Sequence, residues 1–196
     1  GNLIVAESVG DGEATVKNST VKGDLIIKGG GAHSVYLDNV MIEGRVIVEK
    51  KAVKVQLSGK TSVSDIEVNA PCKLVAETFS GSANSITIAK DLGVKDTVSI
   101  NVPVNNVNVK STAQIELQNH AKNVHITNTA QNSKLTVAQT VVIDNMIVDA
   151  KADINGSGKI SKMNVNANDV TVNRSLTVKE VSTASGVKNP LANNPS

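Results

Sequence analysis

Pairs of apolar residues separated by one residue recur along this chain at a nearly constant interval. The first series of pairs advances by 21, 20, 20 and 21 residues and then continues less evenly: Leu25/Ile27, Val46/Val48, Ile66/Val68, Ile86/Ile88, Val107/Val109, Val124/Ile126, Met146/Val148 and Met163/Val165. Alternation with a period of two is typical of a β-strand that has two inward side chains and one outward side chain between them. A unit of about 20 residues that repeats along a chain predicts a stack of coils, in which each coil pairs with the next.

Two further series of pairs lie between the members of the first. The second series is Val35/Leu37, Val55/Leu57, Leu74/Ala76, Val98/Ile100, Ile115/Leu117, Leu135/Val137 and Val170/Val172, and the weaker third series is Val40/Ile42, Leu92/Val94, Val141/Ile143 and Leu176/Val178. The prediction is an all-β, single-stranded parallel β-helix of about eight coils of roughly 20 residues, with three short strands per coil. A β-sandwich is disfavoured, because its hairpins need tight turns and the chain has one Asn-Gly pair, at 155–156.

The repeat also predicts how the chain is divided. Residues 23–180 form the parallel β-helix, residues 1–22 form an N-terminal cap or a first coil, and residues 181–196 form a C-terminal linker that contains Pro190 and Pro195.

Composition fits narrow β-structure and disfavours several kinds of partner. The chain has 30 Val and 22 Asn but one Tyr, one Phe and no Trp, so the core must consist of small β-branched side chains. The net charge is +2 and only Arg45 and Arg174 are arginines, which disfavours nucleic acid. No apolar run approaches the roughly 20 residues of a membrane span, so we expect no membrane insertion.

Two stretches of the sequence resemble a known group of proteins. "GDLIIKGGGAHSVYLDNVMIEGRVIVEK" at 23–50 and "INGSGKI" at 154–160 are similar to right-handed parallel β-helix regions of Gram-positive bacterial surface proteins, which often carry S-layer homology modules. The resemblance implies a right-handed helix, a secreted parent protein and an extracellular, wall-associated setting. It implies a non-enzymatic structural or adhesive module whose partners are other domains of the same surface protein or an extracellular protein or glycan. The alternative is a carbohydrate-binding module or a polysaccharide-degrading enzyme of the pectate-lyase-like fold.

Residues suited to catalysis or metal binding do not cluster in the sequence. Glycoside hydrolysis needs two nearby carboxylates, and the chain has no Asp-Asp, Asp-x-Asp or Glu-x-Glu; acids one coil apart, such as Glu43 and Asp65, are expected by chance. Arg45 and Arg174 are expected to lie far from each other and from any acid cluster. His125 is expected to be a solvated outward side chain, and Cys72 a buried thiol. We therefore expect no catalytic residue, metal ligand or cofactor.

One possible contact surface stands out near the N-terminal end. Ile26 and Ile47 are the central residues of apolar pairs in adjacent coils and should both point outward, whereas later equivalents such as Glu67 are polar. Tyr36 and Met41 should point outward on the neighbouring faces. An exposed apolar patch is usually covered, either by residues 3–5 of the same chain or by a neighbouring domain or partner protein.

Overall fold

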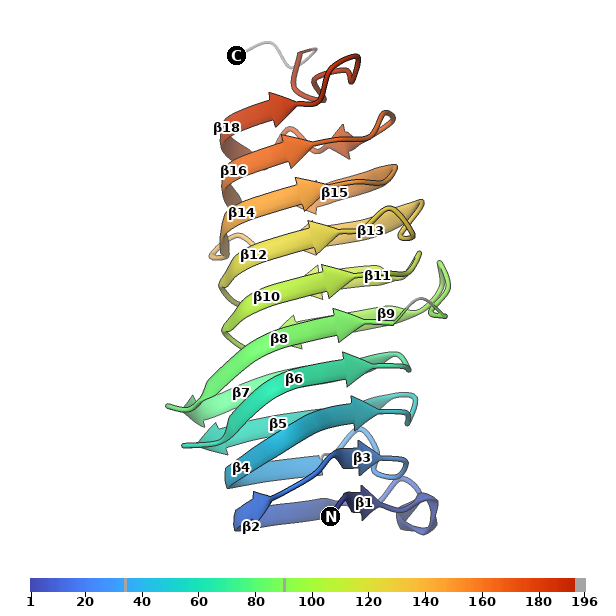
Figure 1. The fold of residues 1–196 in the computed structure, drawn as a ribbon, viewed down its shortest axis with the longest axis vertical. Coiled ribbons are helices and arrows are strands. Elements are labelled where there is room, and N and C mark those ends of the chain that lie inside the picture. Colours follow the sequence, from blue (N-terminus) through green and yellow to red (C-terminus); the bar gives the residue numbers. More distant parts are fainter. Residues whose placement is uncertain (34, 90, 193–196) are drawn as a thin grey trace.

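The chain folds into a right-handed parallel β-solenoid of about nine turns, drawn in Figure 1. The computed structural model describes residues 1–33, 35–89 and 91–192. Every strand ladder among these residues is parallel, and each connects a turn with the next. The predicted fold class is therefore confirmed, with about one turn more than expected.

The strands succeed one another without interruption by an α-helix among the described residues, and a single 3₁₀ turn spans Glu7–Val9. No helix in the described part of the chain has the length and apolar character needed to cross a membrane. The strands are β1 (Leu3–Val5), β2 (Ala14–Val21), β3 (Leu25–Ile27), β4 (Val35–Val48), β5 (Val53–Gly59), β6 (Ser62–Val68), β7 (Cys72–Phe79), β8 (Ser82–Ile88), β9 (Thr97–Asn101), β10 (Val104–Val109), β11 (Gln114–Leu117), β12 (Ala121–Ile126), β13 (Ser133–Val137), β14 (Val142–Val148), β15 (Ala152–Gly156), β16 (Lys159–Val165), β17 (Thr171–Val172) and β18 (Thr177–Thr183).

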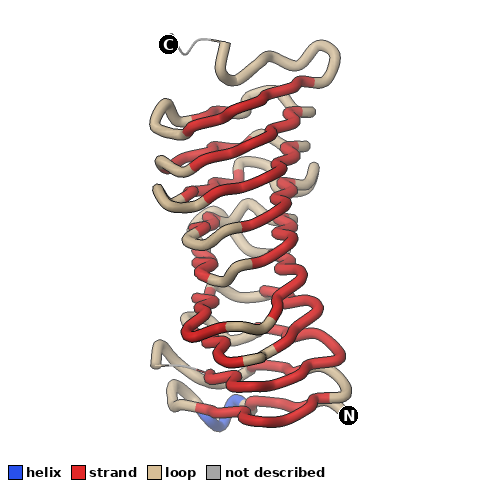
Figure 2. The backbone as a smooth tube through the Cα atoms, turned by 90° about the vertical axis from the view of Figure 1, so that its left-hand side faces the viewer, coloured by secondary structure: helices blue, strands red, loops and turns tan. Residues whose placement is uncertain are grey.

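Each turn has three inward-facing segments; from β6 onward two of them share one bent strand, whereas β4 supplies all three segments of its turn. In β12, Ala121 pairs with Val104 on one face, and after the bend Val124 and Ile126 point inward on the next face. We call the face of the first apolar series face 1, the face of the second series face 2 and the face of Ala121 face 3. The stacked strands and the loops at their corners are visible in Figure 2.

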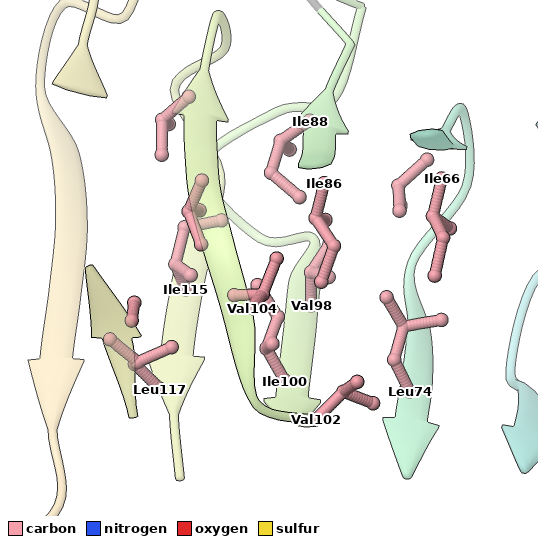
Figure 3. Close-up of a cluster of buried hydrophobic side chains, with 14 of the residues drawn as sticks. Ile66, Leu74, Ile86, Ile88, Val98, Ile100, Val102, Val104, Ile115 and Leu117 are labelled. Carbon is pink, nitrogen blue, oxygen red and sulfur yellow. The ribbon is translucent and has the colours of Figure 1, made fainter. Parts of the chain in front are cut away.

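The register of face 1 follows the prediction throughout. The outward residues form one column in register: Ile26, Ile47, Glu67, Thr87, Asn108, His125, Ile147, Asn164 and Ser182. The apolar pairs beside them are buried, and Leu25, Val46, Ile66 and Ile86 have no exposed surface. Figure 3 shows the labelled core side chains, all hydrocarbon, from turns that succeed one another.

Two details of the other faces differ from the prediction. Leu74 pairs with Ile100 rather than with Val98. The connection between β8 and β9 is longer, so the residue that reaches the position opposite Leu74 on face 2 lies two places further along the chain than predicted. Leu92 and Val94 lie in that connection and not in a strand, so their place in the third series is wrong. Face 3 is instead continued by single residues such as Val63 and Ala83, which do not form an apolar pair and so do not mark the sequence pattern.

Asn and Gly occupy one corner of the early turns, where the backbone has positive φ. Asn18, Asn39 and Gly59 have φ of 48°, 55° and 57°, a region that Gly and Asn adopt more readily than other residues. The Asn39 side-chain oxygen also accepts a hydrogen bond from the Lys60 backbone N–H at 2.9 Å, in the next turn. Asn39 therefore both adopts the corner conformation and connects two turns.

The two ends of the solenoid are built differently. At the N-terminal end β1 pairs edge to edge with β3, and β2 pairs with β4, so residues 1–22 contribute strands to the stack. At the C-terminal end β18 continues to Thr183, and Val187 packs against the core beyond it. How the chain divides into a cap, a helix and a linker stays a prediction.

Candidate functional site

The predicted contact surface contains one continuous apolar column. Ile26 pairs with Ile47, and on its other side Ile4 pairs with Ile26. Ile26 and Ile47 are half-buried, and Ile4 is 54% exposed. The expectation that residues 3–5 cover this patch is wrong, because β1 extends the sheet sideways and adds Ile4 to the patch.

Tyr36 and Met41 lie apart from that column. Tyr36 is on face 2, in register with Gln56, and its hydroxyl donates to the His33 carbonyl at 3.4 Å. Met41 is on face 3, in register with Ser62, and is 54% exposed. The four residues thus occupy three faces, as expected, and only Ile26 and Ile47 adjoin each other. That they form a contact surface stays a prediction.

The acids near the N-terminal end are matched with cations rather than with one another. Arg45 Nη1 lies 2.6 Å from Glu67 Oε2, and Arg45 Nη2 lies 3.5 Å from Asp24 Oδ2. The sequence suggested that Arg45 lies far from acids. The structure shows the opposite, because the strand register places Arg45 between Asp24 and Glu67. Glu43 binds Lys22 at 2.8 Å and Asp65 is in register with Arg45, so these two acids do not face each other as a catalytic pair would.

His125 is bonded rather than simply solvated. Its Nε2 lies 2.7 Å from Asp149 Oδ2, and the Asn166 amide donates to Asp149 Oδ1, also at 2.7 Å. Partial burial raises the pKa of Asp149, but the hydrogen bonds from Asn166 and His125 and the charge of His125 outweigh it, and the net pKa is below the ordinary 3.8. Among the described residues, no group of three His, Cys, Asp or Glu side chains could hold a metal ion.

Cys72 lies in the core at the start of β7, as predicted. Burial raises the pKa of its thiol to about 12. A thiol with this pKa remains protonated at neutral pH and is a poor nucleophile.

A groove of about 570 Å³ opens on face 2. We define the lysine groove by six of its lining residues: Lys51, Lys73, Lys95, Thr97, Ser99 and Glu116. Ser99 points out of β9 between Lys73 and Glu116, with which it is in register, yet only 8% of its surface is exposed. Ser99 therefore lies at the floor of the groove and the lysines stand around it.

One long connection contributes a side chain to the groove. Eight residues of the sequence separate Ile88 of β8 from Thr97 of β9, whereas three separate Val68 of β6 from Cys72 of β7 at the same corner of the preceding turn. Lys95 belongs to the long connection, and Lys73 lies at the start of β7. The longer connection therefore supplies the third lysine of the groove.

The sequence prediction missed these residues although a signal was present. Lys51, Lys73 and Lys95 lie 22 residues apart, which is about one turn. The strand register places Lys73 opposite Lys54 and Ser99, so the three lysines gather at one corner without forming one column of the sheet.

A second, smaller groove of about 310 Å³ lies at the corner near the end of β7 and the start of β10. Its lining includes Phe79, Pro103, His120 and Lys122. His120 Nε2 lies 3.6 Å from Asp144 Oδ2, outside hydrogen-bond distance.

The fold defines this chain as a parallel β-solenoid protein. No family model matches it, and neither the curated proteins nor the solved structures contain a significant match.

Proposed function

We propose that this chain is a non-enzymatic structural and adhesive module, a rigid β-helical segment of a larger bacterial cell-surface protein. The observation that carries the proposal is the unbroken column of face 1, in register from Ile26 to Ser182. Parallel strands lie about 4.8 Å apart, so nine turns make a rod roughly 40 Å long. A rod of this kind separates whatever is attached to its two ends.

Side-chain contacts between turns support a stiff rod. On the early turns Lys17 binds Asp38 at 3.3 Å and Lys28 binds Glu49 at 3.5 Å, each one turn further along. On the later turns Asn123 donates to Asn106 at 3.0 Å, again across one turn. These contacts oppose the sliding of one turn over the next.

The extracellular, wall-associated setting follows from the resemblance to Gram-positive surface proteins with S-layer homology modules. In this setting the Ile26 and Ile47 column, together with Met41 and Tyr36, is the surface offered to another domain of the same protein or to an extracellular partner. An exposed apolar patch of this kind favours protein contact over solvent.

A carbohydrate-binding module is the second candidate, and the lysine groove favours it. The groove is open and crosses several turns, so an extended chain has room to lie in it. No comparable observation favours the polysaccharide-degrading enzyme.

A panel of cell-wall and plant polysaccharides tests this function. Binding is measured by co-sedimentation of the protein with each insoluble polysaccharide, and turnover by the release of reducing ends. We expect saturable binding to at least one polysaccharide without release of reducing ends. Release of reducing ends that scales with protein concentration would contradict the non-enzymatic proposal.

A further inference from the structure

The three lysines of the lysine groove form no ion pair within the part of the chain that the structure describes, whereas four lysines nearer the N-terminus do. Lys17, Lys22, Lys28 and Lys50 each bind a carboxylate within 3.5 Å. Lys51, Lys73 and Lys95 form no ion pair with any described residue. The groove has three ammonium groups and one carboxylate, Glu116, so its charge is positive.

The strand register brings like charges together at this place. Lys54 of β5 is directly in register with Lys73 of β7, on the outward side of adjacent strands. Like charges directly opposite each other in a sheet are destabilising. An anion in the groove would relieve this repulsion, whereas water and salt only screen it.

The groove is elongated along the axis of the solenoid. Its lining residues come from the corner before β4, where Ala32 lies, to Glu116 of β11, which spans four steps between adjacent turns. At about 4.8 Å per step the groove is roughly 19 Å long. An extended polymer fits this shape better than a compact ligand does.

The lining selects the chemistry of that polymer. No aromatic side chain is among the described lining residues, so the groove lacks the flat platform on which sugar rings or nucleobases stack. Arginine, whose fork suits phosphate, is likewise absent from the part of the lining that the structure describes. A lysine ammonium group can instead bind an anion that approaches from many directions. The Thr97 and Ser99 hydroxyls can form hydrogen bonds with the hydroxyl groups of a sugar.

We propose that the lysine groove binds an acidic polysaccharide, a chain of uronate residues that lies along the axis with its carboxylates beside Lys51, Lys73 and Lys95. This proposal rests on the adhesive role proposed above and names its ligand. Glu116 marks the far end, where a carboxylate chain is repelled.

The test is the binding of fluorescent oligogalacturonate, measured by anisotropy at low ionic strength. Lys73→Gln with Lys95→Gln should weaken binding about fivefold to tenfold, because two exposed ion pairs are lost. Lys159→Gln with Lys179→Gln is the matched control, since it removes the same charge from exposed lysines outside the groove and should change affinity less than about twofold. Glu116→Gln should strengthen binding about twofold or more, because it removes the repelling charge.

A second readout separates ligand binding from a purely structural role. Without ligand, Lys73→Gln should leave the melting temperature unchanged or raise it, since it relieves repulsion from Lys54. With saturating oligogalacturonate, the wild-type protein should melt at a higher temperature, and the double variant should lose most of that gain.

Three outcomes would overturn the proposal: no binding of oligogalacturonate at low salt, equal weakening by the groove and control variants, or equally tight binding of a single-stranded oligonucleotide. Each leaves the proposed rod intact, because the rod is tested separately by distances between spin labels along face 1. Binding of neutral dextran in place of oligogalacturonate would retain the adhesive role and reject the acidic ligand.

Discussion

The first three turns and the later turns of this solenoid share one core, but different side-chain contacts join them on the outside. Turns are counted here from the one that contains Ile26 on face 1. On turns one to three, ion pairs connect successive turns: Lys17–Asp38, Lys22–Glu43, Lys28–Glu49, Arg45–Asp24 and Arg45–Glu67. On turns five to seven, an amide ladder does so, in which Asn145 donates to Asn123 at 3.1 Å and Asn123 donates to Asn106 at 3.0 Å. The core therefore fixes the register, and the outer side chains tune how each region responds to salt and pH.

The largest expected effect comes from the core that both regions share. Val48 and Val148 occupy equivalent inward positions on face 1, and neither is exposed. Val48→Asp and Val148→Asp should each lower the free energy of unfolding by about 4 kcal/mol or more, because each buries an unpaired carboxylate. Denaturant titration measures this.

The control for this prediction is the residue beside Val148. Ile147 points outward and is 37% exposed, so Ile147→Asp should cost less than about 0.5 kcal/mol. Equal costs at 147 and 148 would contradict the assigned inward and outward positions.

The next effect concerns the amide ladder. Asn123→Ala removes two hydrogen bonds and should lower the free energy of unfolding by about 1 kcal/mol, equally at low and high salt. Asn128→Ala, at an exposed side chain that forms no hydrogen bond with another described residue, is the control and should have little effect. A loss that disappears in high salt would show that the ladder is not what stabilises these turns.

A smaller effect is expected from the ion pairs. Arg45→Met should cost about 0.5 kcal/mol at low salt, because exposed ion pairs contribute little, and the cost should vanish near 1 M salt. Arg174→Met is the matched control, since Arg174 forms no ion pair with a described residue. If Arg45→Met costs the same at both salt concentrations, packing of its stem and not its charge connects the turns.

How far the sequence predicts this structure depends on the size of the inward residues. Face 1 was predicted step by step, because Val, Ile, Leu and Met mark its inward positions. The inward positions of face 3 were not predicted in this way, since small residues such as Ala83 and Ala121 do not stand out as apolar positions in the sequence. The lysine groove depends on where Lys95, in the connection before β9, lies relative to Lys51 and Lys73, and a local pattern does not encode that. Ile26 and Ile47 were correctly expected to adjoin, because their positions follow from the face 1 register.

The smallest effect is a pH dependence on the later turns. The pKa of Asp149 in the folded protein is lower than in the unfolded chain, so its contribution to stability is present above the ordinary pKa of 3.8 and is lost as pH falls through the lowered value. Asp149→Asn should therefore lose less stability than the wild-type protein when the pH falls below about 4. Thermal unfolding across this range measures the difference, and parallel curves for the two proteins would contradict it.

The most direct test of the account is whether the face 1 column is one straight rod. Cysteines introduced for Ile26, Asn108 and Ser182 lie four turns apart along this column, and spin labels on them report the distances; buried Cys72 stays unlabelled. We expect narrow distributions near 19 Å for 26 to 108 and for 108 to 182, and near 38 Å for 26 to 182, at about 4.8 Å per turn plus the label tethers. A broad distribution for the longest pair, or a value far below the sum of the two shorter ones, would contradict the rigid solenoid.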